Sequence, residues 1–165
     1  MQFGKISTMV QNSNSEVLDS ERLLREWRWL CPQPLTVIDR DAFGDLFLGD
    51  EAGRVHRLDV GSGDFTLIAE SVPEFRSLAL TPERQEEWFQ KDAVNAAKDR
   101  GLIPGAGQCI GFSTPAVFAE GGGLDSAYIA DLYEHVSFLG SIHHQISTLP
   151  DGAKVRLVVQ APKNS

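Results

Sequence analysis

Between residues 35 and 69 the chain alternates short apolar runs with turn-forming sequences, and this pattern constrains the fold more than any other. The apolar or alternating runs lie at residues 35–38, 44–48, 54–60 and 65–69. Residues 49–53 and 61–64, which are rich in glycine and aspartate, separate the later runs. Such residues favour the tight turns of hairpins, and strands spaced by about ten residues are typical of successive hairpins. The sequence therefore predicts an antiparallel meander.

An amphipathic helix is predicted before the meander, over residues 16–30. Its apolar side chains recur at the i, i+1, i+4 and i+7 positions of one helical face: Leu23, Leu24, Trp27 and Leu30. Ser15 or Ser20 is expected to cap its amino end, and Pro32 and Pro34 are expected to end it. Trp29 lies off the apolar face, either as a second core contact or as an exposed aromatic residue.

Helical patterns return after the meander, at residues 72–80, 82–100 and 132–148. Thr81 followed by Pro82 is typical of a helix start, and Gly101 is typical of a helix end. Asp131 is expected to cap the last helix. One face of that helix is apolar and also carries a histidine: Leu132, Val136, Leu139, His143 and Ile146. Further strands are expected at residues 109–112, 116–118, 124–130 and 155–159.

The order of these elements lacks the repeated strand–helix–strand rhythm of a parallel sheet. It predicts an α+β fold, with a single domain in which a mainly antiparallel sheet packs against several helices. The domain is expected over residues 15–160, after a loose amino-terminal segment at 1–14 and before a polar tail at 161–165. A chain of 165 residues, of which 42% are hydrophobic, is long enough to bury the core of one such domain.

The charge balance limits the classes of partner. The chain has 15 basic and 23 acidic residues, which gives a formal net charge of −8. This charge argues against direct binding of nucleic acid or of an anionic membrane surface, because both require clustered basic residues. It favours a basic protein partner instead.

The sequence also favours a cytoplasmic location. No apolar run is long enough to cross a membrane, and residues 1–16 contain no continuous apolar region of a secretory signal. The two cysteines, Cys31 and Cys109, are too few for a disulfide framework. They are expected to be small core residues.

Residues 39–50 have the spacing of a calcium-binding loop, with acids at the first, third and twelfth positions and glycine at the sixth. Phe43 offers no oxygen at the fifth position, and Asp50 replaces the usual longer glutamate. An acidic turn before a strand is therefore the preferred interpretation. His143 lies at the centre of an apolar helix face, so we expect a packed histidine bonded to a backbone carbonyl. His144 is expected to be partly exposed, and no metal or cofactor is expected.

The sequence offers little support for catalysis. His135, His143 and His144 share one helix but lack the i, i+4 spacing of metal-binding pairs. Residues 105–107 resemble the start of a dinucleotide loop but follow a helix and lack its third glycine. Neither cysteine stands in a nucleophile motif. We therefore expect the protein not to be an enzyme; the competing hypothesis is an enzyme that uses His143 or His144 with Glu134.

Two acidic clusters contain the candidate partner-binding residues. Residues 39–51 contain five acidic residues and one basic residue, Arg40. A second acidic cluster follows Pro82. The candidate residues are Asp39, Asp41, Asp45, Asp50, Glu51, Glu83, Glu86 and Glu87. We interpret one cluster, with preference for the first, as a surface that docks on a cationic cleft. The alternative is that both clusters are ordinary solvated surface.

Several segments resemble one family. Residues 127–146 and 149–152 are similar to a Leu-Gly-x-Ile-His-x-Gln helix followed by a Leu-Pro-x-Gly turn, and residues 107–115 are similar to the strand that precedes them. Residues 43–48 and 53–59 are similar to a hairpin of the same proteins. Together they resemble the carboxy-terminal domain of type VI secretion immunity proteins, which lie near the SUKH superfamily. The resemblance spans residues 20–157, and a departure is the triple glycine at 121–123.

The resemblance implies a non-enzymatic cytoplasmic protein that binds and neutralises a cognate toxin, a nuclease effector of a type VI secretion system. A nuclease cleft is positively charged because it holds phosphates, so an acidic protein can block it by steric and electrostatic occupation. The alternative is a regulatory or scaffold module of the SUKH superfamily without a toxin partner. The toxin, the contact surface and the oligomeric state are left open.

Overall fold

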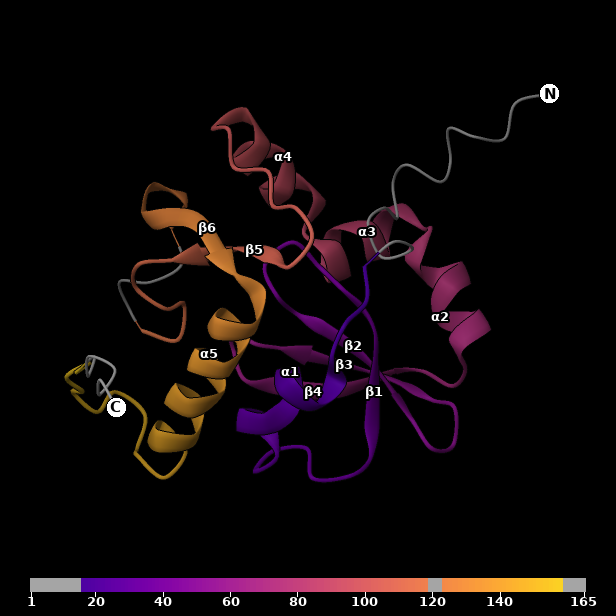
Figure 1. Cartoon of the computed structure of the whole chain (residues 1–165), viewed down its shortest axis with the longest axis horizontal. Coiled ribbons are helices and arrows are strands. Elements are labelled where there is room, and N and C mark those ends of the chain that lie inside the picture. Colours follow the sequence, from indigo (N-terminus) through magenta and orange to yellow (C-terminus); the bar gives the residue numbers. More distant parts are fainter. Residues whose placement is uncertain (1–15, 119–122, 159–165) are drawn as a thin grey trace.

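The four strand-like runs form one antiparallel sheet in the computed structural model, which describes residues 16–118 and 123–158. The strands follow one another in space as they do in sequence (Figure 1): β1 (Leu35–Arg40), β2 (Leu46–Asp50), β3 (Val55–Asp59) and β4 (Asp64–Ala69). Each strand pairs in antiparallel orientation with the next. The predicted meander is therefore confirmed.

Helices and a second, two-stranded sheet complete the described part of the chain. The helices are α1 (Ser20–Leu24), the 3-10 turn η2 (Arg25–Trp27), α2 (Val72–Ala79), α3 (Pro82–Phe89), α4 (Lys91–Asp99), the 3-10 turn η3 (Leu124–Ser126) and α5 (Leu132–Ile146). The second sheet pairs β5 (Gln108–Phe112) with β6 (Ala127–Asp131) in antiparallel orientation. The molecule is a single compact α+β domain, as predicted.

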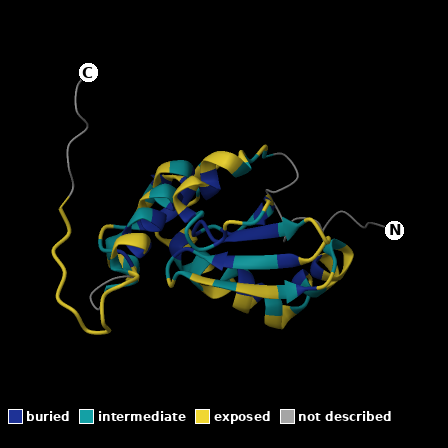
Figure 2. Cartoon of the chain, turned by 90° about the horizontal axis from the view of Figure 1, so that it is seen from below, coloured by how far each residue is buried: buried dark blue, intermediate teal, exposed yellow. Residues whose placement is uncertain are grey.

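Helices cover both faces of the four-stranded sheet. Leu46 and Leu48 of β2 pack into a core with α1, η2 and α5. Phe47, whose side chain points to the opposite face, packs against α2 and α3. Both neighbours of β2 are strands, so the whole apolar part of β2 is buried. The edge strand β4 is more exposed (Figure 2).

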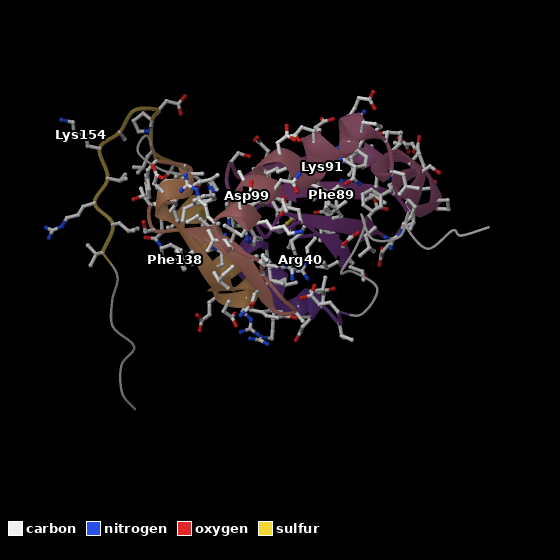
Figure 3. The ribbon with its side chains drawn as sticks, turned by 90° about the horizontal axis from the view of Figure 1, so that it is seen from above. Arg40, Phe89, Lys91, Asp99, Phe138 and Lys154 are labelled. Atoms are coloured by element: carbon white, nitrogen blue, oxygen red, sulfur yellow. The ribbon has the colours of Figure 1, made fainter. Side chains whose placement is uncertain are left out.

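The helix predicted over residues 82–100 is interrupted at Gln90. This residue lies in the left-handed region, with φ 52° and ψ 48°, and separates α3 from α4. Figure 3 labels Phe89 and Lys91, which flank the interruption. The break lets α3 pack against Phe47 while α4 packs against the second sheet. The prediction of one helix is wrong because its two halves belong to different cores.

The first helix is shorter than the predicted span of residues 16–30. It begins at Ser20, and the cap is the side chain of Asp19, which accepts a hydrogen bond from a backbone N–H of α1. Glu16 lies outside the helix and forms a 2.9 Å ion pair with Arg40 of β1, which Figure 3 labels. This long-range contact, together with the cap at Asp19, explains the later start.

The predicted apolar face of this helix packs against α5. The indole Nε1 of Trp27 donates a 2.9 Å hydrogen bond to the carbonyl of Val136. Gly140 permits the close contact, because an added Cβ would lie 2.8 Å from a backbone oxygen of η2. Trp29 is a second core contact, partly buried and bonded to the carbonyl of Gly140. Asp131 caps α5, as predicted.

Three strand predictions are corrected. Residues 116–118 form a turn, in which the N–H of Phe118 donates to the carbonyl of Pro115. In the segment 124–130, the first three residues form η3, and only the rest belongs to β6. Residues 155–158 are not in a strand, and no partner strand among the described residues pairs with them. A strand needs a partner for its backbone groups, which periodicity alone does not supply.

Some predictions lie outside the described residues: the loose segment at 1–14, the cap at Ser15, most of the triple-glycine turn, residue 159 and the polar tail at 161–165. Within the described ranges, every helix is too short or too polar to cross a bilayer.

Candidate functional site

The structure divides the first acidic cluster between the interior and the surface. Asp39, Asp41 and Asp45 are buried, each with 3% of its surface exposed. The side chain of Asp50 is 10% exposed, and only Glu51 is in an exposed position. The five acids therefore do not form one docking surface, because protein atoms enclose three of the carboxylates.

Asp50 organises the turn between β2 and β3. Its carboxylate accepts hydrogen bonds from the backbone N–H groups of Ala52 and Arg54, and lies 3.0 Å from the Nε of Arg54. The Nε2 of His56 lies 2.9 Å from the same carboxylate. The hydrogen bond with His56 is the main reason that the pKa of Asp50 falls to about 2. The role of Asp50 is thus to hold this turn.

Asp41 organises the turn between β1 and β2. Its Oδ1 accepts hydrogen bonds from the backbone N–H groups of Phe43 and Asp45, at 2.9 Å each. Gly44, inside the turn, has φ 94°, a conformation that favours glycine. The structure therefore has an acidic turn that leads into a strand. The described residues contain no group of three or more His, Cys, Asp or Glu placed to hold a metal ion.

Three carboxylates and one guanidinium meet next to this turn. Nη2 of Arg57 donates a 2.7 Å hydrogen bond to Oδ2 of Asp45, and its Nη1 lies 3.6 Å from Oδ2 of Asp59. The side-chain amide of Gln90 donates a 2.8 Å hydrogen bond to Oδ2 of Asp41. Asp41, Asp45, Asp59 and Arg57 are called the carboxylate cluster below.

The carboxylate cluster has more negative than positive charge. Burial raises the pKa of Asp41 to about 6. Burial, and then the charges of Asp41 and Asp59, raise the pKa of Asp45 well above its usual range. Asp39 lies outside the cluster, where burial raises its pKa to about 6. Its Oδ2 has no hydrogen-bond partner among the described residues, and a cation, Arg76, lies 3.6 Å away.

A pocket of about 500 Å³ opens beside the carboxylate cluster. Its apolar walls include Leu139 and the rings of Phe43 and Phe112, which stack with centroids 5.9 Å apart. Its polar walls include two acids of the carboxylate cluster, together with Gln90 and His135. Burial lowers the pKa of His135, so its ring is neutral at pH 7. No lysine or arginine is among the described residues that line this pocket.

The second predicted acidic cluster lies on the surface of α3. Glu83, Glu86 and Glu87 are all exposed. Glu86 accepts a 3.0 Å hydrogen bond from the backbone of Asp92, and Glu87 forms an ion pair with Arg84. The structure therefore brings these three acids together on one helix, and separates them from the buried acids of the first cluster.

Of the candidate nucleophiles and acid–base groups, His143 and both cysteines are buried, whereas His144 and Glu134 are exposed. His143 is 6% exposed, and its Nε2 lies 3.0 Å from the carbonyl of Val60, which confirms the predicted packed histidine. His144 is exposed and stacks on Trp29. Both cysteines are buried. Burial raises the pKa of Cys31 to about 11 and that of Cys109 to about 12, so both thiols are protonated at pH 7.

Sequence reasoning missed the residues that build the pocket. Gln90 lies inside a continuous helical pattern, and Asp59 lies in an alternating strand. Neither residue type marks a site by itself. The only available signal was the density of acids around Asp41 and Asp45, and it pointed to the surface instead of to a pocket wall.

Comparison of the sequence with protein-family models and with curated proteins finds no match. The likeness to immunity proteins therefore rests on the segments quoted above. In the structure, these segments are β5, β6 and α5 together with the β2–β3 hairpin and its flanking residues.

Proposed function

We propose that this protein is an immunity protein that binds a cognate toxin in the cytoplasm and neutralises it. The toxin is a basic nuclease effector of a type VI secretion system. The immunity protein acts as a stoichiometric inhibitor that covers the toxin by shape and by charge, without a catalytic step of its own.

The observation that carries the proposal is the concentration of exposed acids in the stretch that contains α2 and α3. Five exposed acids belong to it, one just before α2 and four on the two helices, and they are called the α2–α3 acidic surface below: Glu70, Glu74, Glu83, Glu86 and Glu87. The same stretch, residues 70–89, contains only two basic residues, Arg76 and Arg84. The stretch therefore has an excess of three negative charges.

Strand pairing brings Glu51 to the same end of the sheet. Val55 pairs with Gly49 on one side and with Ala69 on the other. The β2–β3 turn, which contains Glu51, and the start of α2 therefore leave the sheet at one end (Figure 1). Negative charge on both elements extends the surface that a cationic partner meets.

The electrostatics of such a surface suit rapid inhibition. A nuclease must present cations to bind phosphates, and complementary charge accelerates diffusional association. A fast encounter matters for protection, because the immunity protein must reach the toxin before the toxin reaches nucleic acid. The burial of both cysteines and the bonded state of His143 support binding in preference to histidine- or cysteine-dependent catalysis.

The test is protection of cells that express the toxin domain encoded beside this gene. We expect the wild-type chain to restore growth and to form a stoichiometric complex with the toxin. The triple variant Glu83→Lys, Glu86→Lys and Glu87→Lys is expected to reduce the association rate constant by roughly tenfold or more at low salt. Stopped-flow measurement at several ionic strengths checks this rate.

The matched control reverses three exposed acids that belong neither to the α2–α3 acidic surface nor to the pocket lining: Glu21, Glu26 and Asp151. The control variant has the same change in net charge, so it separates a local surface from the overall charge. Equal loss of rate in both triple variants contradicts the α2–α3 acidic surface as the contact. If the wild-type chain does not protect the cells and instead binds host proteins, the scaffold alternative is favoured.

A further inference from the structure

The pocket beside the carboxylate cluster matches one particular chemical group. We propose that it receives the guanidinium side chain of one arginine of the protein partner and anchors the complex there. The identity of the occupant as a partner residue rests on the proposed function. The preference of the pocket for a guanidinium group is a property of this chain and is tested separately.

The first argument is charge. Asp45 and Asp59 line the pocket, and the described lining has no cationic side chain. Among the ion pairs of the described residues, Arg57 is the cation on the carboxylate cluster, so one guanidinium serves three carboxylates. Burial is the largest cause of the raised pKa of Asp45, and the neighbouring carboxylates raise it further because they oppose its ionisation. A second guanidinium would remove this imbalance.

The second argument is the availability of acceptors. Oδ1 of Asp59 accepts hydrogen bonds from the backbone N–H groups of Gly61 and Ser62. Its Oδ2 accepts none from the described residues, and its nearest cation, Arg57, is 3.6 Å away. The side chain is 30% exposed, so this oxygen is accessible to a donor from outside. A guanidinium carries five N–H donors in a planar fork and suits such carboxylates.

The third argument is the shape and chemistry of the walls. A volume of about 500 Å³ is larger than one side chain needs and leaves room for the approach of a partner surface. The apolar wall formed by Phe43, Phe112 and Leu139 suits the methylene stem of arginine. The stacked phenyl rings also suit a planar cation, which stacks on aromatic faces better than an ammonium does.

The direct test is a titration of the full chain with N-acetyl-L-arginine amide, followed by methyl NMR. We expect saturable shifts at the pocket residues Val60, Val117 and Leu139. The neutral isostere N-acetyl-L-citrulline amide is expected to bind at least about tenfold more weakly, because it lacks the charge-assisted hydrogen bonds. Equal shifts with both probes, or no shift with the arginine probe, overturn the proposal.

Two variants locate the binding. Ala116 is exposed and lines the pocket, so Ala116→Trp is expected to block it and to abolish the shifts. Ala106, an exposed turn residue that is not in the described lining, is the matched control, and Ala106→Trp is expected to bind the arginine probe normally. Asp59→Asn retains an oxygen for the turn but removes the charge, and is expected to weaken binding about tenfold. Thermal unfolding checks that each variant is folded.

The partner assay separates this proposal from the proposed function. Ala116→Trp is expected to accelerate dissociation of the toxin complex at least about tenfold, with little change in the association rate. Unchanged dissociation in a folded Ala116→Trp variant overturns the anchor and leaves the immunity function intact. If the wild-type chain binds the arginine probe but gives no protection, the proposed function fails and the guanidinium pocket stands.

Discussion

Both acidic clusters consist of carboxylate side chains, but most of the first cluster is buried and the second is exposed to solvent. In the first, Asp39, Asp41 and Asp45 are each 3% exposed. In the second, the three glutamates of α3 are exposed. Aspartate is short enough to accept hydrogen bonds from nearby backbone, as Asp41 does at its turn. Glutamate on a helix surface extends into water, so a similar density of acids in sequence gives an interior network in one place and a charged surface in the other.

This contrast also separates two roles of charge. The buried carboxylates of Asp41 and Asp45 define local backbone geometry, and Asp45 also lines the pocket. The exposed glutamates contribute little to stability, because surface ion pairs are screened by solvent, but they remain available for steering a partner. Substitutions of the buried acids and of the exposed glutamates are therefore expected to differ in their effect on stability.

The largest effect is expected from Asp45→Ala. This substitution removes the acceptor of Arg57 and of the backbone N–H of Val60, at 2.7 Å and 3.0 Å. Depriving a half-buried guanidinium of its closest acceptor, and a buried N–H of its acceptor, is expected to lower the free energy of unfolding by about 3–5 kcal/mol. Glu87→Ala, which breaks the exposed pair with Arg84, is expected to cost less than about 1 kcal/mol. Urea denaturation of both variants checks this, and equal losses contradict the division.

Asp39→Asn is expected to raise the free energy of unfolding, by less than Asp45→Ala lowers it. Burial raises the pKa of Asp39 from 3.8 to about 6, so between these pH values the folded state retains a proton that the unfolded state has lost. The contribution of Asp39 to stability therefore falls as the pH rises through this window. The neutral asparagine avoids this loss, so the variant is expected to be more stable at pH 7 by roughly 1–2 kcal/mol.

The control for Asp39→Asn is the pH dependence itself. The stability advantage of the variant is expected to shrink as the pH falls from about 6 towards 3.8, where the wild-type carboxyl becomes neutral. Thermal or urea unfolding at several pH values measures it. A variant that is less stable than the wild type at pH 7 would show that the ion pair with Arg76, at 3.6 Å, outweighs burial.

The smallest effect is expected from Gln90→Gly, at the junction between the two regions. Glycine relieves the strain of φ 52° but loses the 2.8 Å hydrogen bond from the Gln90 amide to Asp41. A hydrogen bond to a charged group is worth more than this strain, so a net loss of about 1 kcal/mol is expected. The free energies of unfolding of the variant and the wild type measure this difference. A variant that is more stable than the wild type would show that the relief of backbone strain exceeds the loss of the hydrogen bond.

Local patterns accounted for most of the secondary structure. The alternation in residues 54–60 and the glycine-containing turns predicted the meander, and Asp131 predicted the start of α5, because each depends on residues close in sequence. The candidate site was predicted only in part. The acids of α3 are on the surface, whereas most of those around Asp41 and Asp45 are not.

The sequence by itself determined the α+β class, the antiparallel order of the first four strands and the packed state of His143. These follow from periodicity and turn chemistry, whose physical causes act within about ten residues. Only the tertiary structure decided which acids are buried, where the long helical pattern breaks and that a pocket forms beside Asp45. Gln90 and Asp41 are 49 residues apart in sequence, and a contact over that distance exists only once the separate cores have packed.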